Sequence, residues 1–120
     1  MSLQLQIEEM PDYLIARFTG PGAAEEVWQQ YESIAERCKR ANKNKLLLDF
    51  LEAHGEISLL DRYFLGGEAQ IFKRYNLQVA TANRPEHLDE KKFAETVARN
   101  RGVNFRVFTK VEDALEWLLK

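Results

Sequence analysis

The stretch KLLLDFLEAHGEISLLDRYFLGGEA, residues 45–69, decides the fold class of this chain. Its LLLDF segment at 46–50 is a continuous apolar run, which is typical of a strand buried on both faces in the interior of a sheet. A short charged loop follows at 52–57, and apolar residues at helical spacing then predict a helix from about Ser58 to Tyr75. A buried strand that leads into a helix indicates a βα unit and therefore a parallel sheet.

The segments before this unit predict a hairpin and a helix. Apolar residues alternate at 3–7 and again at 13–18, with Pro11 in the connection between the two runs, so two strands joined by a tight turn are expected. Residues 24–38 then place apolar side chains at helical spacing for four turns, which predicts one long helix.

The segments after the unit repeat the alternation of strands and helices. A strand at 77–81 is followed by a helix that Gly102 closes, by a strand at 103–107 and by a last helix, for which Thr109 and Glu112 predict a capping box. The order is ββαβαβαβα. We therefore expect an α/β fold with a mixed, mostly parallel sheet, an antiparallel N-terminal hairpin and about four helices.

The composition is that of one ordinary globular domain spanning residues 1–120. Apolar residues make up 45% of the chain, and 17 Lys and Arg against 19 Asp and Glu leave a net charge of −2, which predicts no binding to nucleic acid. The longest apolar runs are far shorter than the roughly 20 residues that span a bilayer. No leader sequence is seen and Cys38 is the single cysteine, so we expect a cytoplasmic protein.

Three stretches together resemble the STAS superfamily, and within it the stand-alone SpoIIAA-like proteins. They are the βα unit at 45–69, the strand LQVAT at 77–81 and the terminal ARNRGVNFRVFTKVEDALEWL at 98–118. The resemblance covers nearly the whole chain. It implies a four- or five-stranded sheet with helices, a bacterial protein, and a regulatory or ligand-binding role in place of catalysis.

Ser58 is the candidate phosphorylation site. The anti-sigma-factor antagonists, which this chain resembles in layout, carry a phosphorylatable serine at the start of the second helix within a DSSG-like sequence. EIS at 56–58 lies where that motif would, but without the preceding Asp, the second serine or the following Gly. The SLLD sequence equally predicts that Ser58 caps the helix together with Asp61. A phosphate would also be stabilised at a helix start, so both roles are open at this point.

The second helix carries an unusually wide apolar arc. Its members are Ile57, Leu59, Leu60, Tyr63, Phe64, Leu65, Ile71 and Phe72. This arc is wider than one sheet face has to cover, and the residues that flank its central stripe form the candidate surface for a ligand or partner. These are Leu59, Tyr63, Leu65 and Phe72.

Gly66 and Gly67 lie in the middle of the same helix. Each costs about 1 kcal/mol relative to Ala in a helix interior, so the pair indicates a close packing contact, a kink or a hinge. A hinge would let the helix open over a pocket or dock on a partner or a lipid surface.

No catalytic or metal site can be assembled from the sequence. Asp49, Glu52, His54 and Glu56 follow a strand end, but their spacing is not diagnostic of any metal, and His87 has no triad-like companion. We expect no metal, no cofactor and no enzymatic activity. The leading hypothesis is a regulatory domain that binds a protein partner through residues 52–72. The alternative is a carrier or sensor of a small apolar ligand or lipid with peripheral membrane contact.

Overall fold

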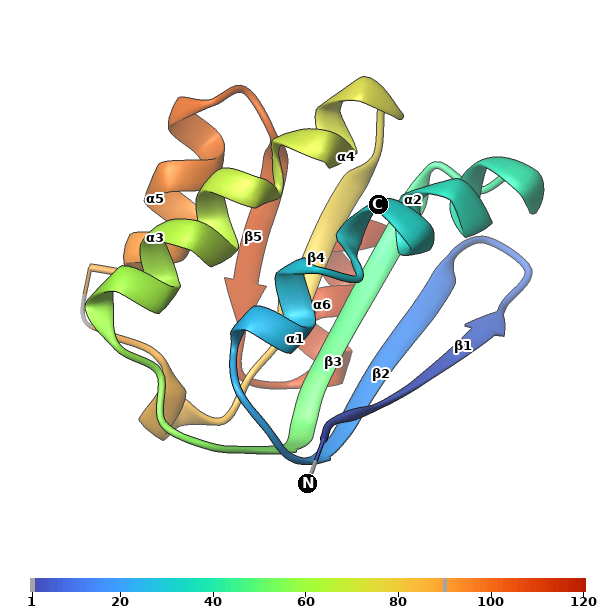
Figure 1. Ribbon diagram of the computed structural model, residues 1–120. Helices are drawn as coiled ribbons and strands as arrows, with labels where there is room; N and C mark the ends of the chain where they lie inside the picture. The colour runs from blue at the N-terminus through green and yellow to red at the C-terminus, as the bar shows by residue number, and fades with distance from the viewer. Residues whose placement is uncertain (1, 90) are drawn as a thin grey trace.

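The computed structural model describes residues 2–89 and 91–120, and a five-stranded sheet runs through them (Figure 1). The first strand pairs antiparallel with the second, and the other three pairings are parallel. In their order across the sheet the strands are β1 (Gln4–Glu9), β2 (Leu14–Pro21), β3 (Lys45–His54), β4 (Gln78–Ala82) and β5 (Asn104–Phe108). The predicted fold class, with its N-terminal hairpin and mostly parallel sheet, is confirmed.

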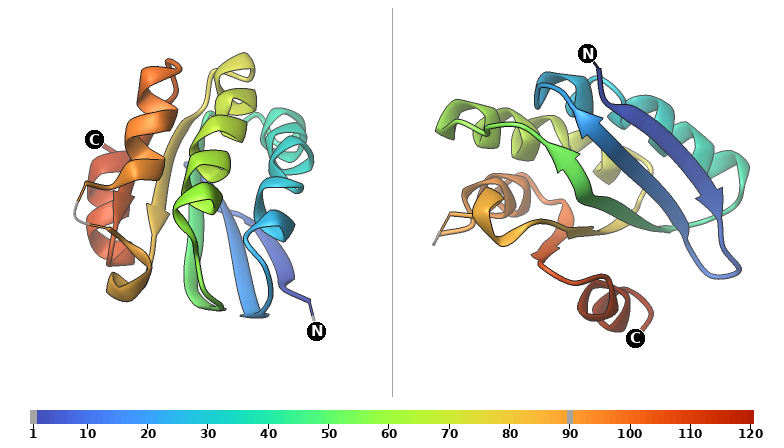
Figure 2. Two further views of the ribbon diagram at one scale, coloured as in Figure 1. Left: turned by 60° about the vertical axis from the view of Figure 1, so that its left-hand side comes forward. Right: turned by 90° about the horizontal axis from the view of Figure 1, so that it is seen from below.

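Helices cover both faces of the sheet (Figure 2). Over one face lie α1 (Glu25–Trp28), α2 (Tyr31–Arg40), α3 (Leu59–Glu68), α4 (Gln70–Arg74) and α5 (Phe93–Asn100). Over the other lies α6 (Val111–Leu118), and a 3₁₀ turn, η1 (Pro85–His87), follows β4. Among the described residues, no helix has the length and apolarity needed to cross a bilayer.

β3 is the central strand, as LLLDF predicted. Leu46, Leu47 and Leu48 have no exposed surface. Leu46 and Leu48 pack in the core beneath α1–α5, while Leu47 packs in the smaller core beneath α6. Because successive side chains of a strand point to opposite faces, a strand can be apolar throughout only where both faces are covered.

Two helices that were predicted to be continuous are each bent into two. The helix expected over 24–38 becomes α1 and α2, and the Gln30 amide at the bend donates to the Val27 carbonyl three residues earlier (3.0 Å). The helix expected from Ser58 to Tyr75 becomes α3 and α4, joined at the buried Ala69, whose carbonyl accepts from the Phe72 amide (2.9 Å). Such 3₁₀ bonds tighten the turn and redirect the helix axis.

The ends of the last two helices differ in how well they were predicted. Gly102 closes α5 with a φ of +84°, as expected. The Thr109 capping box is wrong: the N-cap of α6 is Lys110, and no side chain caps it. The helix begins one residue later than predicted, which places Glu112 at the second helical position, whereas the reciprocal bond needs the third.

Candidate functional site

The outer face of α3 exposes four large apolar side chains. Leu59 and Leu60 are 63% and 64% exposed, and Tyr63 and Phe64 on the next turn are 40% and 36% exposed. Phe64 also reaches α1, where its ring lies 5.3 Å from that of Trp28, measured between centroids. We name Leu59, Leu60, Tyr63 and Phe64 the α3 face.

The predicted surface set is partly wrong. Leu59 and Tyr63 belong to the α3 face, but Leu65 is half-buried against the core. Phe72 has no exposed surface, and its ring packs 4.8 Å from that of Tyr31. A new helix starts at the bend at Ala69, so residues after the bend do not continue the apolar arc that the prediction assumed for one straight helix.

Ser58 caps the helix that carries the α3 face. Its Oγ accepts a hydrogen bond from the Asp61 amide (3.0 Å), and its own amide donates to Asp61 Oδ2 (2.9 Å), which completes a capping box. The predicted cap is confirmed. Ser58 is exposed, and it lies one residue before Leu59, so the candidate phosphorylation site is directly next to the α3 face.

The two glycines of α3 occupy different environments. Gly66 is buried against α5, and a Cβ added there would overlap the Ala94 carbonyl and lie 2.9 Å from the Val97 Cβ. The three atoms nearest to a Cβ added at Gly67 would all belong to the Arg101 guanidinium, at 3.5 Å or more. Close packing therefore explains Gly66. The helix is continuous through both glycines, and its bend comes later, at Ala69.

Arg62 ties α3 to the loop that precedes α5. Its Nη2 donates to the His87 carbonyl (3.1 Å), and its Nε lies 3.7 Å from the carboxylate of Asp89. Asp89 in turn accepts a hydrogen bond from the Phe93 amide at the start of α5 (3.1 Å). This link was not predicted, because nothing in the sequence signals that Arg62 and Asp89 meet.

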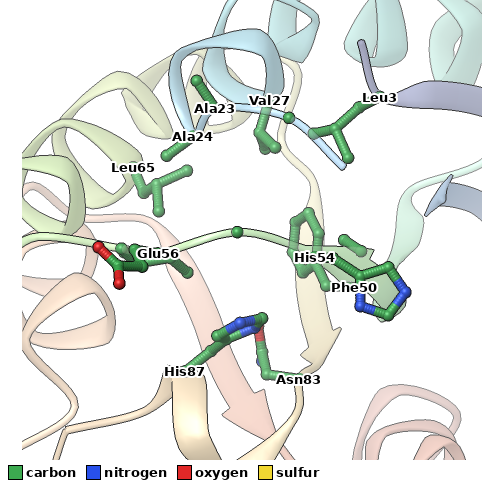
Figure 3. Close-up of a pocket in the computed structure, with 14 residues that line it drawn as sticks. Leu3, Ala23, Ala24, Val27, Phe50, His54, Glu56, Leu65, Asn83 and His87 are labelled. Carbon is green, nitrogen blue, oxygen red and sulfur yellow. The ribbon is translucent and has the colours of Figure 1, made fainter. Parts of the chain in front are cut away.

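Two small cavities lie behind the loop at 55–57, over the carboxyl ends of β3 and β4, and Figure 3 shows the larger of them. Their volumes are about 70 and 50 Å³. Both are lined by Phe50 and Leu65 and, on the side of the β4 end, by Asn83 and His87. These volumes suit water molecules and are far below the roughly 300–1,000 Å³ of sites for small-molecule ligands.

Glu26 holds the beginning of the chain beside the larger cavity. Its carboxylate accepts hydrogen bonds from the amides of Ala23 (2.8 Å) and Leu3 (3.0 Å). These hydrogen bonds lower the pKa of Glu26 below its usual value, because they stabilise the charged form of the carboxyl group. The bond from the Ala23 amide has the largest effect.

The residues considered for chemistry are divided between the sheet and the larger cavity, which His54, Glu56 and His87 line. Asp49 is bound to Arg17 (3.2 Å) and to the Leu51 amide (3.0 Å), so it is a structural group of the sheet. In the described part of the chain, no three His, Cys, Asp or Glu side chains converge as metal ligands would. Burial raises the pKa of the Cys38 thiol to about 12, which keeps it protonated and unreactive at neutral pH.

Comparison with solved structures identifies the fold of the chain. A DUF3478-family protein from Shewanella loihica PV-4, described as having a SpoIIAA-like fold, matches with a TM-score of 0.53 and 26% sequence identity over 97% of this chain and 93% of the other. This chain has the SpoIIAA-like fold of STAS domains. The resemblance noted in the sequence is therefore confirmed at the level of the fold.

Two further SpoIIAA-like structures match over nearly their full length. An anti-sigma factor antagonist from Mycobacterium paratuberculosis has a TM-score of 0.65 and 9% identity, with 99% of this chain and 96% of the other covered. A variant of RsbS from Moorella thermoacetica has a TM-score of 0.62 and 13% identity, with 97% and 95% covered. These two likenesses show a shared fold. No family model matches the chain, and no curated protein matches it significantly.

Proposed function

We propose that this SpoIIAA-like protein is a non-catalytic regulatory domain that works in the cytoplasm by binding a protein partner through the α3 face. The observation that carries the proposal is the exposure of four large apolar side chains on two turns of a single helix. A contiguous patch of this kind on a small domain marks an interaction surface, because its exposure to water is unfavourable until a partner covers it.

The similar structures favour a protein as the partner. An anti-sigma factor antagonist is by name a protein that opposes another protein. The helix that carries the α3 face is capped by Ser58, the residue that the sequence matched to the phosphorylatable serine of those antagonists. We propose that phosphorylation of Ser58 would weaken partner binding. A phosphate would add negative charge beside the Asp61 carboxylate and disturb the cap next to Leu59.

The alternative of an apolar-ligand or lipid carrier has less support. The two cavities of about 70 and 50 Å³ do not accommodate a lipid chain, and Gly66 packs α3 closely against α5. Peripheral contact with a membrane would use the same side chains of the α3 face, and the experiment below separates it from protein binding.

The test is site-specific photocrosslinking in the native host. A photoreactive amino acid replaces Leu60 on the α3 face and, as the control, Leu119, which is 42% exposed after the end of α6. We expect a discrete protein adduct from position 60 that position 119 does not give. With the purified partner, Leu60→Ser should weaken binding about tenfold or more, whereas Leu119→Ser should leave it unchanged. Crosslinks to lipid alone, or identical adducts at both positions, would contradict the proposal.

A further inference from the structure

The α3 face continues into a basic groove. A groove of about 930 Å³ begins beside Trp28, Tyr63 and Phe64 and passes toward α4. A second groove, of about 760 Å³, follows the ends of α2 and α4. Glu32, Ile71 and Arg74 line both, so the two hollows form one path, which we name the α2–α4 groove. Figure 1 shows α2 and α4 at the edge where the parallel strands begin.

The charge of this groove opposes that of the whole chain. The basic side chains that line it are Lys39, Lys43, Lys73, Arg74 and Arg101. Only two acidic residues, Glu32 and Glu68, line it with them, although the net charge of the chain is −2. None of the five cations forms an ion pair with a carboxylate of residues 2–89 or 91–120. The groove therefore carries a net positive charge.

The fold explains why these cations gather. Lys39 lies in the last turn of α2, and Lys73 and Arg74 lie in the last turn of α4, where positive charge is favourable at the carbonyl end of a helix. α2 and α4 end beside each other because each leads into one of two paired parallel strands, β3 and β4. The helix dipole explains why Lys39, Lys73 and Arg74 each lie at a helix end. The parallel pairing of β3 and β4 explains why these helix ends lie at the same edge of the sheet.

Two of the cations are held in place without being neutralised. Lys43 Nζ donates to the Pro11 carbonyl (2.8 Å), which fixes the ammonium group while leaving its charge uncompensated. Arg101 Nη2 donates to the Tyr63 hydroxyl (3.0 Å), and its Cζ lies 5.6 Å from the centre of the Tyr63 ring. Arg101 therefore joins the apolar α3 face to the basic groove.

We propose that the partner binds through an amphipathic peptide segment, whose apolar residues cover the α3 face and whose acidic residues lie in the α2–α4 groove. This rests on the proposed function and adds the chemistry of the partner. Opposite charge across an interface steers association and fixes the direction in which the segment lies. A peptide can enter a groove between two helices, whereas a flat bilayer reaches only the rim.

The test selects ligands from a phage-displayed library of random peptides on the full chain at low ionic strength. We expect the selected peptides to carry acidic residues next to apolar ones. The double variant Lys39→Glu, Arg74→Glu should weaken their binding by about tenfold or more, and physiological salt should also weaken it. The matched control is Arg106→Glu, Lys110→Glu, which reverses two exposed charges away from the groove and should leave binding unchanged.

Thermal unfolding checks that each variant folds, and the neutralising pair Lys39→Gln, Lys73→Gln replaces the charge reversal if that variant does not. The inference would be overturned if the selected peptides had no excess of acidic residues and if Leu60→Ser, but not charge reversal, weakened their binding. That result would leave the proposed function standing. Peptides insensitive to both changes, or no selected peptides at all, would contradict both. Tighter binding of a single-stranded oligonucleotide or of anionic vesicles, lost in the same double variant, would overturn the assignment to a peptide.

Discussion

Substituting Ala for each glycine of α3 tests the packing that holds the α3 face in place. The Cβ of Gly66→Ala would overlap the Ala94 carbonyl oxygen, a backbone atom that cannot rotate away, and would lie 2.9 Å from the Val97 Cβ. Overpacking of this kind costs about 1–3 kcal/mol, and the gain in helix propensity returns up to about 1 kcal/mol. We therefore expect Gly66→Ala to lower the free energy of unfolding by about 1–2 kcal/mol.

Gly67→Ala is the matched control, because the two residues are neighbours in the same helix. Its Cβ would lie 3.5 Å or more from Arg101, in ordinary van der Waals contact. The substitution should raise the free energy of unfolding by about 0.4–1 kcal/mol, because the unfolded chain loses backbone freedom.

Urea titration with thermal unfolding measures both variants, and for a domain of this size 1 kcal/mol corresponds to roughly 3–6 °C in Tm. A Gly66→Ala protein as stable as wild type would refute the close contact between α3 and α5. A destabilised Gly67→Ala would show that the space described beside Arg101 is not available.

Three further predictions concern single side chains. Ser58→Ala should lower the free energy of unfolding by about 1 kcal/mol in urea titration, while Ser58→Asp should change it by only a few tenths, because Asp also caps helices. The pKa of Glu26 is lowered on folding, so the contribution of this carboxylate to stability is complete above its ordinary pKa of 4.5 and is lost as the pH falls through the lowered pKa. Glu26→Gln should therefore flatten the acid side of the plot of unfolding free energy against pH. An unchanged plot would show that the hydrogen bonds of Glu26 contribute nothing to stability. Cys38, with a pKa raised to about 12, should react with a thiol reagent at pH 8 only after unfolding in urea, so rapid labelling of the native protein would contradict its burial.

The order of strands and helices was predictable from the sequence because it depends on local patterns. LLLDF could be placed in the sheet interior because a strand that is apolar on both faces has to be covered on both. Ser58 and Asp61 could be paired because a capping box joins residues three apart along the chain. Gly102 could be assigned to a helix end because its left-handed backbone conformation is one that glycine adopts without strain.

The working surface was decided by contacts between segments distant in the sequence. Gly66 and Gly67 are equivalent in the sequence, and only the approach of Ala94 on α5 makes one of them intolerant of a side chain. Phe72 matched Tyr63 in apolar character, but the bend at Ala69 turns it into the core. The basic groove exists because β3 and β4 are parallel neighbours, which brings the ends of α2 and α4 together. Residue periodicity determines which side of a helix is apolar, whereas the packing of other elements determines how much of that side is left exposed.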